Sequence, residues 1–175
     1  MDPSRTPFTL IRATRQEVAA VARQLLQRRE SLALAESCTG GLLSAALTAV
    51  PGSSAYFLGS VVCYGNASKQ RLLGVPAATL DRYGAVSAAV AKALASGARA
   101  RFGADWSLAI TGVAGPSGGS AAKPVGTVCI AVAGPGGRPR ASVHHFSGSR
   151  TQIRRQSAAA ALALLGRAIC LRQPR

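Results

Sequence analysis

The 175-residue sequence has few acidic residues, lysines, histidines and aromatic residues, and each shortage narrows what the chain can be. Six acidic residues stand against 21 basic ones, which gives a formal net charge of +15. The two histidines, His144 and His145, are adjacent, and the four cysteines form no CxxC pair, so no zinc-ligand spacing occurs. We therefore expect no metal site, and we expect the cysteines to be reduced thiols.

Long apolar runs are also missing. No run is long enough to span a membrane, and the N-terminus lacks the apolar core of a signal peptide, so we expect a cytoplasmic protein without a membrane partner. A hydrophobic content of 48% with 15% charged residues is typical of a folded chain. We predict a loose leader over residues 1–13, a single domain over residues 14–170 and a basic tail over residues 171–175.

The basic residues are mostly arginines, and these gather toward the two ends of the chain. A charge balance of this kind can indicate nucleic acid, a membrane surface or an acidic ligand as partner. Few aromatic residues lie among the arginines to stack on bases, and heavy use of Arg and Ala can also reflect a coding bias. Nucleic acid therefore remains an open but less favoured partner.

The apolar pattern alternates between helical and strand periods along the chain. Helices are expected over residues 14–29, 42–50, 66–73, 87–101 and 149–169, and strands over 32–35, 55–64, 104–111, 126–133 and 141–146. The strand over 55–64, rich in aromatic and β-branched residues, is expected to be buried. Thr14 with Glu17 and Ser149 with Gln152 have capping-box spacing, and Asn66 is the expected N-cap of its helix. This order predicts an α/β domain whose mixed sheet is covered by helices on both faces.

A polar turn of sequence ESCTGG, at residues 36–41, separates a buried strand from a helix. Gly40 and Gly41 allow a tight turn, and free amide groups at the start of the following helix suit an anion or an oxyanion. We hypothesise that Ser37 is a nucleophile held at this turn. Cys38 is the alternative nucleophile.

Two other strands deliver polar groups to the same edge of the sheet, where open α/β folds collect their ligands. Tyr64 ends one strand, and Lys69 follows in the first helical turn, where the helix dipole should lower its pKa. Thr111 ends the other strand, before a glycine-rich loop that fits neither a P-loop nor a dinucleotide fingerprint, so no cofactor is expected. No suitably placed Asp-His pair exists, so the base is Lys69 or Tyr64, and the reaction is hydrolysis of an amide or ester.

Several motifs in order resemble the CinA C-terminal domain family, whose active members are nicotinamide-nucleotide amidases (NMN deamidases, PncC type). They are AESCTGGLL, CYGNASKQRLLGV, ITGVAGPSGG with KPVGTV, and HHFSGSRTQIR, and the resemblance covers about residues 14–170. It implies a three-layer α/β/α sandwich with a mixed, mostly parallel sheet, no metal, and a dimer or larger homo-oligomer. It also implies hydrolysis of nicotinamide mononucleotide to nicotinate mononucleotide and ammonia, a step of NAD salvage.

The resemblance assigns roles to individual residues. Ser37 would be the nucleophile, with Lys69 and Tyr64 as its proton-transfer partners. The substrate, a pyridine mononucleotide, would be contacted by residues of the turn and of the third strand end, namely Thr39, Gly40, Gly41, Thr111 and Gly112, and its anionic part by Arg150. Glu36 would face the pyridinium or hold the turn, and we favour the second role.

The sequence departs from the family pattern at four places. Gly65 replaces a usual Ser or Thr, Ala88 a usual Glu, Ala121 and Ala122 an acidic pair, and Ser149 the Asp of a GDR triplet. These losses of carboxylates keep a second interpretation open. In it the chain is a catalytically silent binding or regulatory module, linked to competence or DNA damage.

Overall fold

The computed structural model describes residues 15–172. The predicted leader, the Thr14 half of the first capping box and the last three residues of the predicted tail lie outside the described residues. Five strands form one sheet in the order β2-β1-β3-β4-β5. They are β1 (Leu32–Glu36), β2 (Phe57–Val62), β3 (Trp106–Gly112), β4 (Thr127–Ala133) and β5 (Arg140–His145).

The sheet is mixed, as predicted. Strand β1 pairs in parallel with β2 and β3, whereas β3 with β4 and β4 with β5 are antiparallel, so β4 alone runs against the other strands. The glycine-rich segment after β4 thus closes the expected hairpin. Because β1, β2 and β3 are parallel, their carboxyl ends meet at one edge, where residues 36–37, 63–64 and 111–112 lie.

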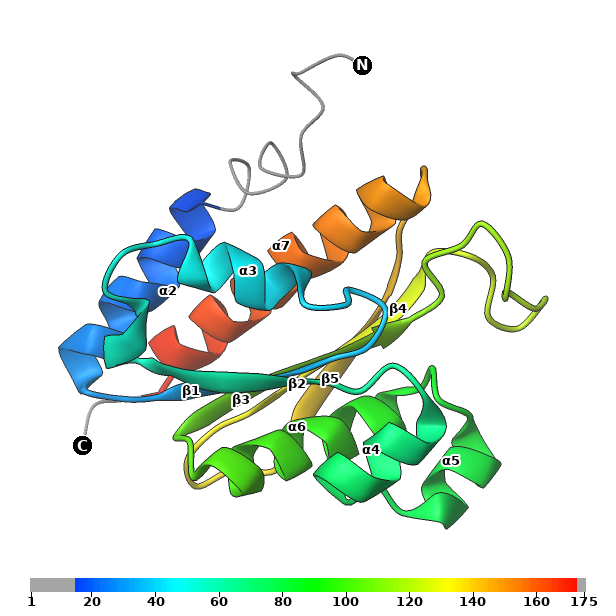
Figure 1. Ribbon diagram of the computed structural model, residues 1–175, viewed down its shortest axis with the longest axis horizontal. Helices are drawn as coiled ribbons and strands as arrows, with labels where there is room; N and C mark the ends of the chain where they lie inside the picture. The colour runs from blue at the N-terminus through cyan, green and yellow to red at the C-terminus, as the bar shows by residue number, and fades with distance from the viewer. Residues whose placement is uncertain (1–14, 173–175) are drawn as a thin grey trace.

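Helices cover both faces of the sheet and give the expected three-layer α/β/α sandwich (Figure 1). On one face lie α2 (Arg15–Arg28), α3 (Leu42–Thr48) and α7 (Arg150–Cys170), and on the other α4 (Asn66–Leu73), α5 (Ala77–Tyr83) and α6 (Ala88–Phe102). A short 3-10 turn, η2 (Ser53–Ala55), leads into β2. No helix within residues 15–172 combines the length and the apolar character needed to cross a membrane.

The sheet separates two apolar cores of different character. Strand residues with large side chains, such as Leu34 and Ile110, pack toward α2, α3 and α7. Their neighbours on the other face are small, such as Ala35 and Ala109, and meet an alanine-rich face of α6. Small residues on both sides let α6 lie close to the sheet, which explains why this helix contacts every strand.

Two local expectations were wrong. Strand β2 is not buried: Leu58 is 47% and Val62 48% exposed, because β2 is an edge strand that pairs only with β1. Asn66 is the first residue of α4 rather than its cap. Gly65 takes the N-cap position, with no side chain to bond the helix amides.

Two other helices begin where they were predicted to begin, to within one residue. Ser87 accepts a hydrogen bond from the amide of Val90 at the start of α6. Ser149 and Gln152 form a complete capping box at the start of α7. The second cap fixes the direction in which α7 leaves the sheet, and its first turn therefore faces the edge that carries the polar turn.

Candidate active site

The turn after β1 is built around the buried carboxylate of Glu36. Gly40 and Gly41 have positive φ angles of 57° and 88°, which glycine adopts without strain. This turn brings the start of α3 over the carboxylate, which accepts hydrogen bonds from the amides of Gly41, Leu43 and Ser44 at 2.8–3.1 Å. The Ser44 hydroxyl donates a fourth, at 2.5 Å. Glu36 therefore holds the turn, which is the role that we favoured.

This arrangement changes which amides could receive an oxyanion. The start of α3 already faces the carboxylate of Glu36, so its amides are not free for a ligand. The Ser37 amide donates to the carbonyl of Ile110, and that of Gly40 to the carbonyl of Ser37. Among the described residues, the amides of Cys38 and Thr39 have no hydrogen-bond partner. They are the available donors beside Ser37.

Lys69 reaches Ser37 from the opposite layer. Its side chain is only 1% exposed, and its Nζ lies 3.2 Å from Ser37 Oγ. The same nitrogen donates to the carbonyl oxygens of Cys63 and Tyr64 at 2.9 and 3.0 Å. These two carbonyls fix the amine. A neutral amine has two hydrogens for them and one lone pair for the Ser37 hydroxyl.

Burial lowers the pKa of Lys69 from its ordinary value of 10.5, because the charged ammonium is poorly solvated. The sequence suggested the helix dipole as the cause of such a shift, whereas burial is the largest cause in the structure. Electrostatic interactions with Cys63, Cys38 and Tyr64 act in the opposite direction and raise this pKa by less than burial lowers it. A lowered pKa favours the neutral amine, which is the form that can accept a proton.

Tyr64 lies at the rim. Its side chain is 59% exposed, and its hydroxyl accepts a 2.8 Å hydrogen bond from Arg150 rather than meeting Ser37. Arg150 also donates to the carbonyl of Gly115 in the glycine-rich loop, at 2.7 Å. The Tyr64 carbonyl, not its hydroxyl, contacts Lys69. The structure thus brings Ser37 and Lys69 together and places Tyr64 with Arg150 beside them.

Arg154 belongs to this site although the sequence did not single it out. Its guanidinium donates to the carbonyl of Thr39 through Nε at 3.2 Å and Nη2 at 2.6 Å. It therefore ties α7 to the turn that carries Ser37. The available signal was its spacing: Arg154 lies four residues after Arg150, on the same face of one helix.

Two of the other expected ligand contacts, Thr111 and Gly112, are engaged in structural contacts. Thr111 is buried, and its hydroxyl donates to the carbonyl of Ala85. Gly112 lies against β4, where an added Cβ would come within 2.8 Å of both the Val128 side chain and the Thr127 carbonyl. Thr39 is buried too, and its hydroxyl has no hydrogen-bond partner among the described residues.

The alternative nucleophile Cys38 is buried. Burial raises the pKa of its thiol to about 11. Burial is the largest of several effects on this pKa, and the nearby charge of Arg154 is one of those that lower it. The reactive thiolate is therefore scarce at neutral pH. This environment favours Ser37 over Cys38.

None of the departures from the family pattern replaces Ser37, Tyr64 or Lys69. Ala88 opens α6, and Ala121 and Ala122 are exposed in the loop before β4. Ser149 keeps a capping function at α7. Only Gly65 is close in sequence to the site, at the cap of the helix that carries Lys69.

Comparison with known proteins identifies the family of the chain. The family model described as CinA C-terminal domain matches residues 14–169. A CinA-like protein of Anaeromyxobacter sp. (strain K) is 55% identical over 145 residues, which is 83% of this chain and 35% of the relative. One of Synechococcus sp. (strain CC9902) is 64% identical over 116 residues, 66% of this chain and 28% of the relative. The chain spans about a third of the length of these curated relatives.

Solved structures show the same architecture. The competence-damaged protein (CinA) superfamily protein of Klebsiella pneumoniae 700603 superposes with a TM-score of 0.86 at 36% identity, covering 90% of this chain and 98% of that one. The superfamily protein of Escherichia coli gives a TM-score of 0.84 at 33% identity, covering 98% of this chain and 94% of that one. Fold, motifs and sequence agree, and the chain belongs to the CinA C-terminal domain family.

Proposed function

We propose that this protein is an amidase that deamidates nicotinamide mononucleotide to nicotinate mononucleotide and ammonia. The observation that carries the proposal is the pair formed by Ser37 Oγ and the buried Lys69 Nζ, 3.2 Å apart. A serine needs a base to become a nucleophile, and a desolvated lysine is such a base. Family membership supports the choice of substrate.

In the first half of the reaction, neutral Lys69 takes the hydroxyl proton as Ser37 Oγ attacks the carboxamide carbon. The carbonyl oxygen becomes an oxyanion, which the free amides of Cys38 and Thr39 stabilise. The protonated Lys69 then gives its proton to the amide nitrogen. The C–N bond breaks, ammonia leaves, and an ester joins Ser37 to the pyridine carbonyl.

The second half uses the same groups with water. Lys69, neutral again, removes a proton from water as the water oxygen attacks the ester carbon. The tetrahedral intermediate collapses, the bond to Ser37 breaks, and the proton on Lys69 returns to Ser37 Oγ. The product is the carboxylic acid, which ionises to nicotinate mononucleotide.

The rim of the site suits the charged parts of this substrate. Arg150 carries a donor-rich guanidinium at the mouth, where the phosphate of a mononucleotide would meet it. The exposed ring of Tyr64 offers a flat face for the cationic pyridinium. Arg154 would not contact the substrate, because its donors are directed at the Thr39 carbonyl. It is a positioning residue in this proposal.

The test is ammonia release from nicotinamide mononucleotide by wild type, Ser37→Ala and Lys69→Met in metal-free buffer. Ser96→Ala is the matched control, because Ser96 is an exposed serine on α6. We expect turnover in wild type and in the control, and none above background in the two site variants. A folded wild type without turnover, or a Ser37→Ala variant with full activity, would contradict the proposal.

A second candidate function is a catalytically silent binding module that acts on DNA. It is favoured by the net charge of +15, and among the structural neighbours one is named competence damage-inducible protein A. Binding to a short DNA duplex should then weaken steeply with salt, because phosphate contacts release counterions. Retention of DNA binding in an amidase-inactive wild type would make this the better assignment.

A further inference from the structure

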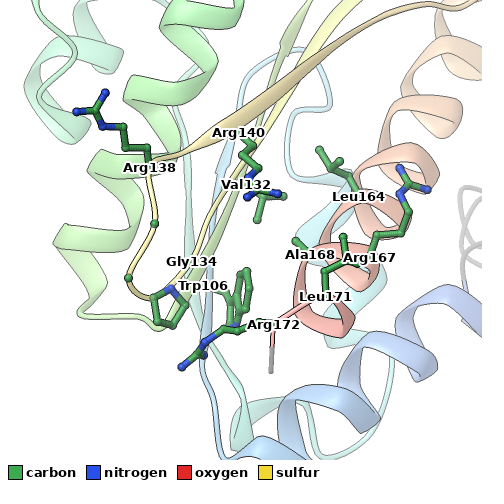
Figure 2. A pocket seen from close by; sticks show the side chains of 13 residues that line it. Trp106, Val132, Gly134, Arg138, Arg140, Leu164, Arg167, Ala168, Leu171 and Arg172 are labelled. Carbon is green, nitrogen blue, oxygen red and sulfur yellow. The ribbon is translucent and has the colours of Figure 1, made fainter. Parts of the chain in front are cut away.

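A cavity lies at the opposite end of the sheet from Ser37. It measures about 370 Å³, is open to solvent on one side and is lined by the start of β3, the β4-β5 turn and the last turns of α7 (Figure 2). The apolar part of its wall is formed by Trp106, Val132, Leu164, Ala168 and Leu171. Volumes in this range suit a small organic ligand.

Arginines supply the polar part of the lining. Arg140 points into the cavity over Val132, and Arg172 lies beside Trp106 (Figure 2). Arg138 and Arg167 stand at the rim with their guanidinium groups turned outward. The cavity therefore combines an apolar floor with one arginine that points inward, Arg140, and further arginines at its border.

Only one of these charges is neutralised by an acidic group within residues 15–172. Glu30 forms an ion pair with Arg172 and also accepts a 2.7 Å hydrogen bond from the indole of Trp106. No other salt bridge occurs among the described residues. Around the cavity, no carboxylate within residues 15–172 thus pairs with Arg138, Arg140 or Arg167.

The sheet register explains why the cavity is open. Val132, opposite Arg140 in the β4-β5 ladder, belongs to the core on the α7 side. Arg140 therefore faces the α7 layer, since directly paired residues share a face of the sheet. At this outer strand α7 does not cover the sheet, because its main strand contacts are with β3 and β4. The uncovered corner holds Arg140 over the apolar floor.

We propose that this cavity binds a small organic anion in which an aromatic ring carries a carboxylate, phosphate or sulfonate group. The apolar floor would take the ring, and Arg140, with Arg167 swinging inward, would take the acidic group. A cavity of about 370 Å³ fits a small molecule better than an extended nucleic acid, which needs a long basic track. A second copy of this chain is disfavoured as the occupant of this cavity, because it carries a net charge of +15, which has the same sign as the arginines that it would have to meet.

This site is separate from the proposed amidase chemistry. Trp106 is the first residue of β3, whereas Thr111, beside the Ser37 turn, is near the end of the same strand. A variant in the cavity should therefore leave the Ser37–Lys69 pair intact. Equally, loss of the amidase chemistry should leave the cavity able to bind its ligand.

The probe is 8-anilinonaphthalene-1-sulfonate, whose fluorescence rises on binding, compared with its neutral analogue N-phenyl-1-naphthylamine. Wild type should bind the sulfonate more tightly than the neutral compound. Arg140→Met should weaken sulfonate binding about tenfold, as expected for one charge-assisted contact, and change neutral binding little. Arg71→Met is the matched control, because Arg71 is an exposed residue of α4, and it should behave like wild type.

A cavity-filling variant separates a built site from a merely basic surface. Ala168→Phe keeps every arginine but occupies the floor, so it should abolish sulfonate binding while the thermal midpoint shows a folded protein. Ser37→Ala should bind the dye like wild type, whatever its amidase activity. Equal affinity for the two dyes, or unchanged sulfonate binding in Arg140→Met or Ala168→Phe, would overturn the proposal.

Discussion

Replacing Lys69 by methionine is the sharpest test of the site. Methionine keeps the length and the apolar stem of lysine but cannot accept a proton, so Ser37 loses its base. General-base catalysis contributes about 10²- to 10⁴-fold in rate, which corresponds to about 3 to 5 kcal/mol of transition-state stabilisation. We therefore expect kcat for ammonia release to fall by at least about a hundredfold, with a smaller change in KM.

Stability is the necessary companion measurement. The change leaves the buried carbonyls of Cys63 and Tyr64 without the donor that Lys69 provides, at a cost of about 1–3 kcal/mol each. It also removes a buried amine whose charged form is poorly solvated, which offsets part of that cost. We expect the two effects to leave the variant folded, as measured by urea unfolding.

The pH dependence has a definite sign. Because burial lowers the pKa of Lys69 below 10.5, wild-type kcat/KM should rise with pH and level off before 10.5, as the amine becomes neutral. The unfolded chain holds this proton more tightly, so wild-type stability should also rise with pH between the folded pKa and 10.5. Lys69→Met should lose this contribution, and the exposed Lys92→Met control should keep it.

The assay is single-turnover ammonia release at several pH values, with each variant checked for folding. A Lys69→Met enzyme within tenfold of wild type would refute the role of Lys69 as the base. A wild-type profile that is still rising at pH 10.5 would refute its activation by burial. The Lys92→Met control guards against effects of net charge alone.

Three further predictions concern the neighbours of this pair. Tyr64→Phe should lower kcat less than tenfold and raise KM more, because the lost hydroxyl contacts Arg150; a loss as large as that of Lys69→Met would contradict this. Glu36→Gln should destabilise the fold by about 2–4 kcal/mol in urea unfolding, since an amide cannot accept all four hydrogen bonds; a loss below about 1 kcal/mol would argue otherwise. Arg154→Met should reduce kcat about tenfold, and Arg154→Lys should restore part of the activity. Equal activity of the two variants would contradict a positioning role for the Arg154 contact with the Thr39 carbonyl.

Local sequence patterns predicted most of the fold. Helix α7 begins where Ser149 and Gln152 have capping-box spacing, and the buried strand β1 follows from the apolar run 32–35. Strand β2 was misjudged because its aromatic and β-branched residues resemble those of a central strand. Whether a strand is central or at an edge depends on sheet order, and a single strand's composition does not contain that order.

The site shows the same division between local and long-range information. Ser37 and Lys69 were found because each follows a strand whose end meets the same edge of the sheet. The Tyr64 hydroxyl was paired with them by chain proximity, yet its partner is Arg150, 86 residues away. Contacts of this length depend on how the layers pack, which explains why Arg154 was missed as well.

The base that we propose, Lys69, has no carboxylate partner among the described residues, and this bears on the positions where the chain departs from its family. Lys69 Nζ contacts Ser37 and two carbonyls, and no carboxylate of the described residues bonds to it. The one acid of the turn, Glu36, has its oxygens occupied by α3. A carboxylate beside Nζ would favour the ammonium and hold the proton that catalysis must move. The Ser37–Lys69 contact therefore forms in a chain that has alanine at positions 88, 121 and 122.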